Sequence, residues 1–131
     1  KILFFMIDHI NIPVKNLKES KIFYKNALAP LGYGILMENE THCGIGPISG
    51  KEKWIGTCWL VESTSATVLH IAFRVTHRSI VDLFYKAALL AGGICNGKPG
   101  IREEYHTNYY GAFIRDPDGH NVEVVCHEEV N

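Results

Sequence analysis

The first part of the chain alternates apolar and polar residues with the period of a β-strand and then changes to the period of a helix. The alternation over residues 10–14 predicts a half-buried strand. A helix is predicted to follow Asn16, because Asn16 and Glu19 occupy the N-cap and N3 positions of a capping box. The run Pro30-Leu31-Gly32 should end this helix.

The same pattern recurs 61 residues later without a gap. Of the 24 positions from 9 to 32, nine are identical to their counterparts in 70–93, including His9 with His70 and the run Phe-Tyr-Lys at 23–25. The repeat predicts a second strand over 69–75 and a second helix from about Ser79 to Ala91. An internal duplication therefore organises the chain.

Further strand-like runs complete each half. They cover Thr57–Val61 in the first half and Tyr109–Arg115 and His120–Cys126 in the second. Asp116-Pro117-Asp118-Gly119 is a turn signal that joins the last two into a hairpin, whereas residues 38–56 give no clear assignment. We predict an α+β fold of two tandem βαβββ modules, 6–66 and 67–128. Each is too small to bury a core alone, so they should pack together, with helices on one sheet face and a cleft on the other.

Composition narrows the range of functions. The 131 residues carry 13 Lys+Arg and 14 Asp+Glu, and 47% are hydrophobic, which excludes a disordered chain and the charge pattern of a nucleic-acid or anionic-membrane binder. No two of the four cysteines are spaced as a C-x-x-C pair, so we expect reduced thiols and a cytoplasmic protein. Because position 1 is not Met, we expect Met6 to be the natural start and residues 1–5 to be expression-derived.

Strand parity places three chemically distinctive residues on the sheet face that no helix covers. His9 and His70 point away from the apolar positions of their strands, and Glu123 points away from the neighbouring valines. Two histidines and a carboxylate form a ligand set suited to Fe(II), Mn, Zn, Ni or Co, with open positions for water and substrate. We therefore predict a divalent-metal site at these residues. The alternative is that all three are solvated or hydrogen-bonded sheet residues.

Glu62 is a candidate fourth ligand. It follows His9 by 53 residues, the same spacing that separates His70 from Glu123. Only seven residues lie between Glu62 and His70, so an exposed strand end is the favoured interpretation of Glu62.

Three further residues are candidates for contact with a substrate. Arg74 shares the face of His70, where it could pair with an anionic group, although a surface arginine at a strand end explains it equally well. His106 and Tyr110 belong to a segment rich in ligand-binding groups, 103–110, that could close over the cleft; aromatic packing at the sheet edge is the alternative. The remaining histidines are expected to be solvated or capping residues: His42, His77, His120 and His127.

The segments Asp8-His9-Ile10, 69–73 (Leu-His-Ile-Ala-Phe) and 116–123 (Asp-Pro-Asp-Gly-His-Asn-Val-Glu) resemble those of vicinal oxygen chelate proteins. This is the glyoxalase, bleomycin resistance and extradiol dioxygenase group. The resemblance covers nearly the whole chain, from Met6 to His127, and its last segment is the most specific. It implies that the paired modules form an open, cup-shaped mixed β-sheet with the helices on the outer face. It also implies a homodimer, because such cups are often completed between chains.

The resemblance carries site roles as well. His9, His70 and Glu123 match the metal positions of the family, and Glu62 falls near the fourth position of glyoxalase I-type members. A metal-bound glutamate serves as the base in some relatives, which makes Glu123 the candidate catalytic residue here.

Two classes of function follow. The first is a metal-dependent enzyme of lyase or isomerase type, whose small-molecule substrate chelates the metal through adjacent oxygens; an extradiol dioxygenase or a thiol transferase on the same scaffold is an alternative. The second is a metal-free protein that binds an antibiotic-like ligand and so confers resistance. The chain contains no P-loop, dinucleotide fingerprint or nucleophile elbow, which argues against nucleotide-dependent and serine-hydrolase chemistry.

Overall fold

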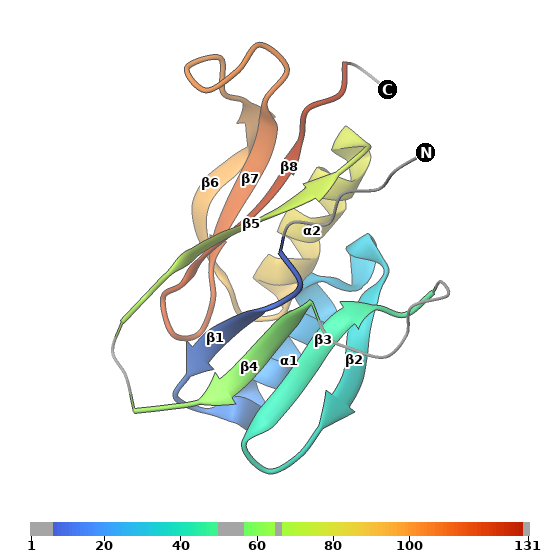
Figure 1. The fold of residues 1–131 in the computed structure, drawn as a ribbon. Coiled ribbons are helices and arrows are strands. Elements are labelled where there is room, and N and C mark those ends of the chain that lie inside the picture. The colour runs from blue at the N-terminus through green and yellow to red at the C-terminus, as the bar shows by residue number, and fades with distance from the viewer. Residues whose placement is uncertain (1–6, 50–56, 65–66, 130–131) are drawn as a thin grey trace.

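The computed structural model describes residues 7–49, 57–64 and 67–129 of the chain, and over these it forms two four-stranded sheets, each with one helix against one face (Figure 1). The predicted start at Met6 and the predicted additions at 1–5 lie outside the described residues. The predicted module boundary between residues 66 and 67 borders residues 65–66, which also lie outside the described part of the chain, and it stays a prediction. The elements are β1 (Ile10–Val14), α1 (Leu17–Ala27), a 3₁₀ turn (Ala29–Leu31), β2 (Tyr33–Glu38), β3 (His42–Pro47), β4 (Cys58–Glu62), β5 (His70–Val75), α2 (Arg78–Leu90), β6 (Ile94–Ile101), β7 (Tyr110–Arg115) and β8 (Asn121–Cys126).

The two sheets repeat one topology. Their strand orders are β1-β4-β3-β2 and β5-β8-β7-β6. In each sheet the first strand pairs in parallel with the last, and the other pairs are antiparallel. The predicted α+β fold of two βαβββ modules is confirmed. Three strands were not located by the periodicity of the sequence: β2, β6 and β3, the last of which lies within the stretch that had no clear assignment.

Local signals in the sequence explain where the elements begin and end. The Oδ1 of Asn16 accepts the N–H of Glu19 at 3.0 Å, which caps the N-terminus of α1 as predicted. The turn between β7 and β8 contains Gly119 with φ +87°, a left-handed conformation that glycine adopts without a steric penalty. None of the described helices is long and apolar enough to cross a membrane.

One hydrophobic core joins the two modules. The apolar face of each sheet packs against its helix, and the two helices also contact each other. Burying one aromatic side chain such as Phe23 or Phe84 contributes about 2–3 kcal/mol relative to leaving it in water. The opposite face of each sheet carries no helix, and it is there that β5 and β8 present their polar side chains. The largest fully buried apolar side chains are Phe23, Tyr24, Phe84, Ile12, Leu28, Ile45, Leu60 and Ile114.

Candidate functional site

The site centres on a hydrogen-bonded pair from the two central strands of the second module. The register of β5 and β8 sets Ala72 opposite Glu123, so His70 lies one step away on the same face. The Nε2–H of His70 donates to Oε2 of Glu123 at 2.8 Å. The carboxylate is buried at 1% exposure, whereas about half of the imidazole, 52%, remains exposed. The pair therefore joins a buried carboxylate to a partly exposed imidazole.

Tyr109 supplies the second partner of this carboxylate. Its hydroxyl donates to Oε1 of Glu123. Desolvation, followed by the hydrogen bond to Glu123, raises the pKa of the Tyr109 phenol well above its ordinary value of 10.0. The phenol therefore stays a proton donor at neutral pH. Sequence reasoning missed Tyr109, although its alternation with Gly111 and Phe113 could have placed it on the face of Glu123.

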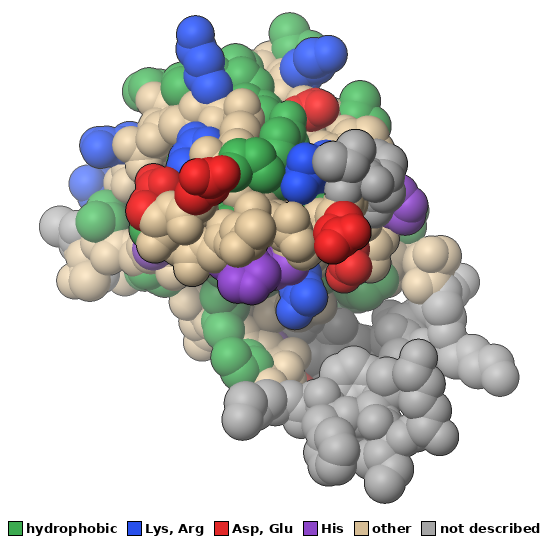
Figure 2. All heavy atoms as spheres, turned by 90° about the horizontal axis from the view of Figure 1, so that it is seen from above, with side chains coloured by type: hydrophobic (Ala, Val, Ile, Leu, Met, Phe, Trp, Pro, Cys, Tyr) green, Lys and Arg blue, Asp and Glu red, His purple; other side chains and the backbone are tan. Residues whose placement is uncertain are grey.

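Aromatic rings surround Tyr109 at the rim of the site. Its ring makes edge contacts with Tyr105 and with His127, each at 5.1 Å between centroids. His106 in turn contacts His127 at 5.8 Å, so it lies at the rim rather than against the His70–Glu123 pair. Figure 2 views the molecule from the end that carries the β6–β7 loop and shows histidine side chains at the surface with acidic side chains nearby. His127 is half-buried here, which corrects the expectation of a solvated residue.

Arg74 lies on the face of His70, as parity predicted. Its side chain is 69% exposed and approaches Glu128 at 3.9 Å. An exposed pair at this distance contributes little to stability. The guanidinium can therefore turn toward an anionic ligand at low cost.

His9 stands apart from the other two predicted ligands. It precedes β1 in the first module, and its Nδ1–H donates to Oδ1 of Asp8 at 2.5 Å. Among the described residues, His9, His70 and Glu123 do not form a cluster with ligand atoms within 4.8 Å of one another. With Nδ1 engaged and the side chain 49% exposed, Nε2 is the nitrogen of His9 left for another partner.

The structure places Glu62 away from the site. Its Oε2 accepts the N–H of Leu17, the first residue of α1, at 3.2 Å. The equal spacings of 53 residues did not reflect equivalent positions, because β1 and β4 pair Asn11 with Trp59, whereas β5 and β8 pair Ala72 with Glu123. Trp59 is thus the structural counterpart of Glu123. Glu62 lies three residues further along and on the helix-covered face, where an acidic group at a helix N-terminus is favourable.

Tyr110 lies on the helix-covered face of its sheet, whereas a residue that contacts the substrate was expected on the helix-free face. Its hydroxyl donates to Oδ1 of Asp82 on α2 at 2.7 Å, and the guanidinium of Arg78 lies 5.2 Å from its ring centroid. Because side chains alternate along a strand, Tyr110 must point opposite to Tyr109. It packs beneath the sheet against α2.

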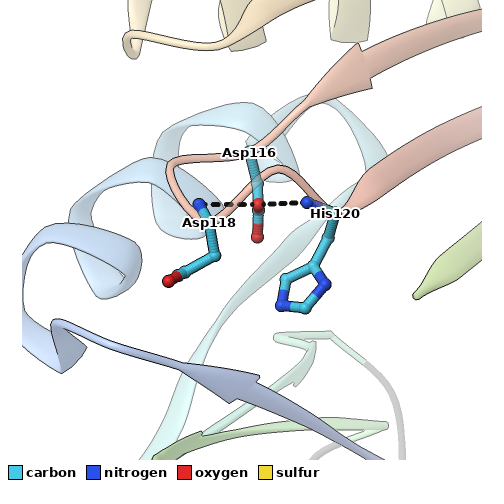
Figure 3. Close-up of side chains that lie close together, drawn as sticks. All are labelled: Asp116, Asp118 and His120. Carbon is cyan, nitrogen blue, oxygen red and sulfur yellow. Dashed lines mark hydrogen bonds between the residues drawn. The ribbon is translucent and has the colours of Figure 1, made fainter. Parts of the chain in front are cut away.

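A second polar cluster, Asp116, Asp118 and His120, lies at the turn between β7 and β8, and its ligand-type atoms are within 4.8 Å of one another. Oδ1 of Asp116 accepts the backbone N–H groups of Asp118 and His120 (Figure 3). Its Oδ2 accepts the hydroxyl of Tyr24 at 2.6 Å. The carboxylate of Asp118 accepts the N–H of Lys15 and the hydroxyl of Ser20, at 3.0 and 3.3 Å.

His120 completes this cluster and is 1% exposed, which corrects the expectation of a solvated residue. Its Nδ1 accepts the N–H of Leu69 at 3.0 Å, and its Nε2–H donates to the carbonyl of Pro13 at 2.6 Å. Both ring nitrogens are thus engaged by backbone groups. The three residues act as a clamp that ties the second module to β1 and α1, with no donor atom of His120 left for a metal.

The His70–Glu123 pair differs from the clamp in the chemistry it can perform. In the described part of the chain, no lysine or arginine forms an ion pair with Glu123, so only neutral or titratable donors face a buried carboxylate. A divalent cation would compensate this charge, and imidazole nitrogen with carboxylate oxygen is a suitable donor pair. The residues therefore fit a divalent metal.

Comparisons with known proteins identify the family of this chain. The sequence profile of the Glyoxalase/Bleomycin resistance protein/Dioxygenase superfamily matches residues 6–124. A metallothiol transferase, FosB, from Shouchella clausii is 31% identical over an alignment of 129 positions, which covers 90% of this chain and 77% of the relative. The crystal structure of a glyoxalase/bleomycin resistance protein from Albidiferax ferrireducens has a TM-score of 0.72 at 24% identity, covering 91% of this chain and 96% of that one.

A variant of glyoxalase I from Zea mays shares the fold as well, with a TM-score of 0.68 at 22% identity over 91% of this chain and 46% of that chain. At these identities the two solved structures establish the architecture, and the sequence match over most of the chain establishes the family. The chain belongs to the glyoxalase/bleomycin resistance protein/dioxygenase superfamily.

Proposed function

We propose that this protein is a divalent-metal-dependent enzyme that acts on a small molecule chelated through two adjacent oxygens. The observation that carries the proposal is the pair of His70 Nε2 and Glu123 Oε2 at 2.8 Å, in which a carboxylate with 1% exposure has no permanently charged partner among the residues that the structure describes. The metal would be Zn, Ni, Fe, Mn or Co, since all accept mixed imidazole and carboxylate ligands. When bound, it would act as a Lewis acid toward the substrate oxygens.

The third ligand is His9 of a second copy of the chain. Among the described residues of one chain His9 does not join the other two, and Asp8 holds its Nδ1, which leaves Nε2 for another partner. A twofold homodimer would then contain two equivalent sites, each built from β1 of one protomer and β5 and β8 of its partner. The membership of the chain in this superfamily supports the arrangement.

The residues around the pair have distinct roles in this proposal. Glu123 would take up a proton from a substrate carbon in a lyase or isomerase reaction, while the Tyr109 hydroxyl holds its Oε1. Arg74, exposed on the same face, binds an anionic group of the substrate. His106 contacts the substrate from the rim.

Thiol transfer is the second candidate reaction. It is favoured by the 31% identity to a metallothiol transferase over 90% of this chain. In such a reaction a thiolate sulfur bonds to a substrate carbon, the carbon–oxygen bond opens, and the released oxygen takes up a proton. The two reactions are distinguished by whether turnover needs a thiol as a consumed co-substrate.

Elemental analysis of protein purified without a metal-affinity tag tests the proposal. We expect a transition metal at one equivalent per chain, or one-to-one binding after apo-protein is titrated with Zn²⁺, Ni²⁺ or Mn²⁺. The loaded protein is then assayed with a hemithioacetal, a catechol and an epoxide that has a neighbouring oxygen, each with and without added thiol. Failure to bind any of these metals would contradict the proposal and favour the metal-free ligand-binding protein.

A further inference from the structure

We propose that Tyr109 is a positioning residue, which holds Oε1 of Glu123 so that Oε2 and Nε2 of His70 together form the metal-binding edge. The inference rests on the proposed metal function. The two carboxylate oxygens have different partners: the Tyr109 hydroxyl donates to Oε1, and His70 lies 2.8 Å from Oε2. Only Oε2 therefore faces the exposed imidazole.

The ring of Tyr109 is itself held in place. Tyr105 and His127 contact it edge-on, each at a centroid distance of 5.1 Å and with interplanar angles of 65° and 88°. These contacts come from the β6–β7 loop and from the residue after β8, so they fix the ring from two segments of the chain. The hydroxyl is consequently aimed at Glu123 before any metal binds.

Gly111 leaves the space in which this hydrogen bond forms. A Cβ at position 111 would lie 3.2 Å from the ring of Tyr109 and 3.3 Å from Oε1 of Glu123. Both distances are shorter than ordinary van der Waals contacts, so a side chain here would require the phenol or the carboxylate to shift by a few tenths of an ångström. Glycine at this position lets the phenol and the carboxylate keep their places without such a shift.

The terminal torsion of a glutamate is broad and roughly twofold, so an unsupported carboxylate samples several orientations. Removing the Tyr109 hydroxyl would free this torsion and leave Oε1 buried without its donor. The carboxylate could then turn Oε1 toward the metal or engage it through both oxygens. Tyr109 thus controls how Glu123 presents itself, without being a ligand.

The test compares Tyr109→Phe with Tyr110→Phe in the full-length protein. The two variants lose the same atom at adjacent positions, and each loses one hydroxyl-to-carboxylate hydrogen bond, but Tyr110 bonds to Asp82 on the opposite face. Titration calorimetry with Zn²⁺ should show affinity about 10–100-fold weaker in Tyr109→Phe, the usual effect of removing a partner of a metal ligand. Tyr110→Phe should bind as the wild type does. The Co²⁺-loaded Tyr109→Phe variant should also show an altered visible absorption spectrum, because the coordination by Glu123 changes.

A second variant, Gly111→Ala, disturbs the same hydrogen bond without removing the hydroxyl and should weaken Zn²⁺ binding as well. Equal affinities and equal Co²⁺ spectra in the wild type, Tyr109→Phe and Gly111→Ala would overturn the positioning role while leaving the metal site intact. A wild-type protein that binds none of Zn²⁺, Ni²⁺, Fe²⁺, Mn²⁺ and Co²⁺ would overturn the metal function, and the role of Tyr109 with it.

Discussion

Two histidines of this chain are predicted to give opposite results when each is replaced by alanine. His120→Ala removes the clamp between the modules, in which Nδ1 accepts the N–H of Leu69 and Nε2–H donates to the carbonyl of Pro13. Each backbone group left without its partner costs about 1–3 kcal/mol. With the packing of a side chain that is 1% exposed also lost, the free energy of unfolding should fall by about 3–5 kcal/mol.

His70→Ala should keep its stability and lose zinc affinity. The His70 ring is 52% exposed and lies on the helix-free face, so folding should tolerate its loss. Zinc affinity should fall strongly because a metal ligand is removed. For a chain of this length, 1 kcal/mol corresponds to about 3–4 °C in Tm, so His120→Ala should unfold about 9–20 °C lower than the wild type. Calorimetric unfolding of the apo-proteins measures stability, and Zn²⁺ titration at 15 °C, where both variants are folded, measures affinity.

The structural role of His120 would be refuted if His120→Ala lost zinc binding with little change in the free energy of unfolding. That result would make Asp116, Asp118 and His120 the metal site, despite the backbone partners that occupy both nitrogens of His120. His127→Ala is the matched control: it removes a half-buried imidazole at the rim and should shift the free energy of unfolding by about 1 kcal/mol or less.

Three further predictions concern the dimer, the clamp and the substrate. His9→Ala and His70→Ala should each be inactive, yet refolding them together should recover about one quarter of the wild-type activity, because mixed dimers contain one intact site; no recovery would exclude a shared site. Burial raises the pKa of Asp116 above its ordinary value of 3.8, so the folded state holds this proton more tightly than the unfolded chain does. The contribution of Asp116 to the free energy of unfolding should therefore decrease as the pH rises from 3.8 through the raised pKa. Urea unfolding over that range should show a smaller decrease in Asp116→Asn; an unchanged pH dependence would contradict the assignment. Arg74→Gln should raise KM for anionic substrates more than for neutral ones in steady-state assays, and an equal effect on both would contradict anion binding.

Strand periodicity predicted which residues share the site face, but it could not assign roles near a strand end. A shift of one residue moves a side chain to the other face of a sheet, and Tyr109 and Tyr110 are neighbours at the start of β7. The sequence offered both as aromatic residues of one loop. The structure separates them, with one hydroxyl on Glu123 and the other on Asp82.

The equal spacings suggested Glu62 as a fourth ligand, but it is an exposed residue at the end of β4, which was the favoured interpretation. The repeat holds at one offset through β1 and α1, but the strands that follow do not keep it, and the pairing of Asn11 with Trp59 rather than with Glu62 shows the three-residue difference. Hydrogen-bond register, not sequence distance, decides which side chains become equivalent.

The sequence alone determined both helices, the strands β1, β4, β5, β7 and β8, and the faces on which His70, Arg74 and Glu123 lie, because the period of a strand or helix is a local property of the backbone. It also determined the turn at 116–119 and the cap at Asn16, since both depend on residues that are close in the chain. It did not locate β2, β3 and β6. Only the tertiary structure decided that His120 is buried, because its partner Pro13 is 107 residues away in the sequence. It likewise brought Tyr109 against Glu123 and kept His9 apart, since such contacts follow from how sheets pack and pair, which no local pattern encodes.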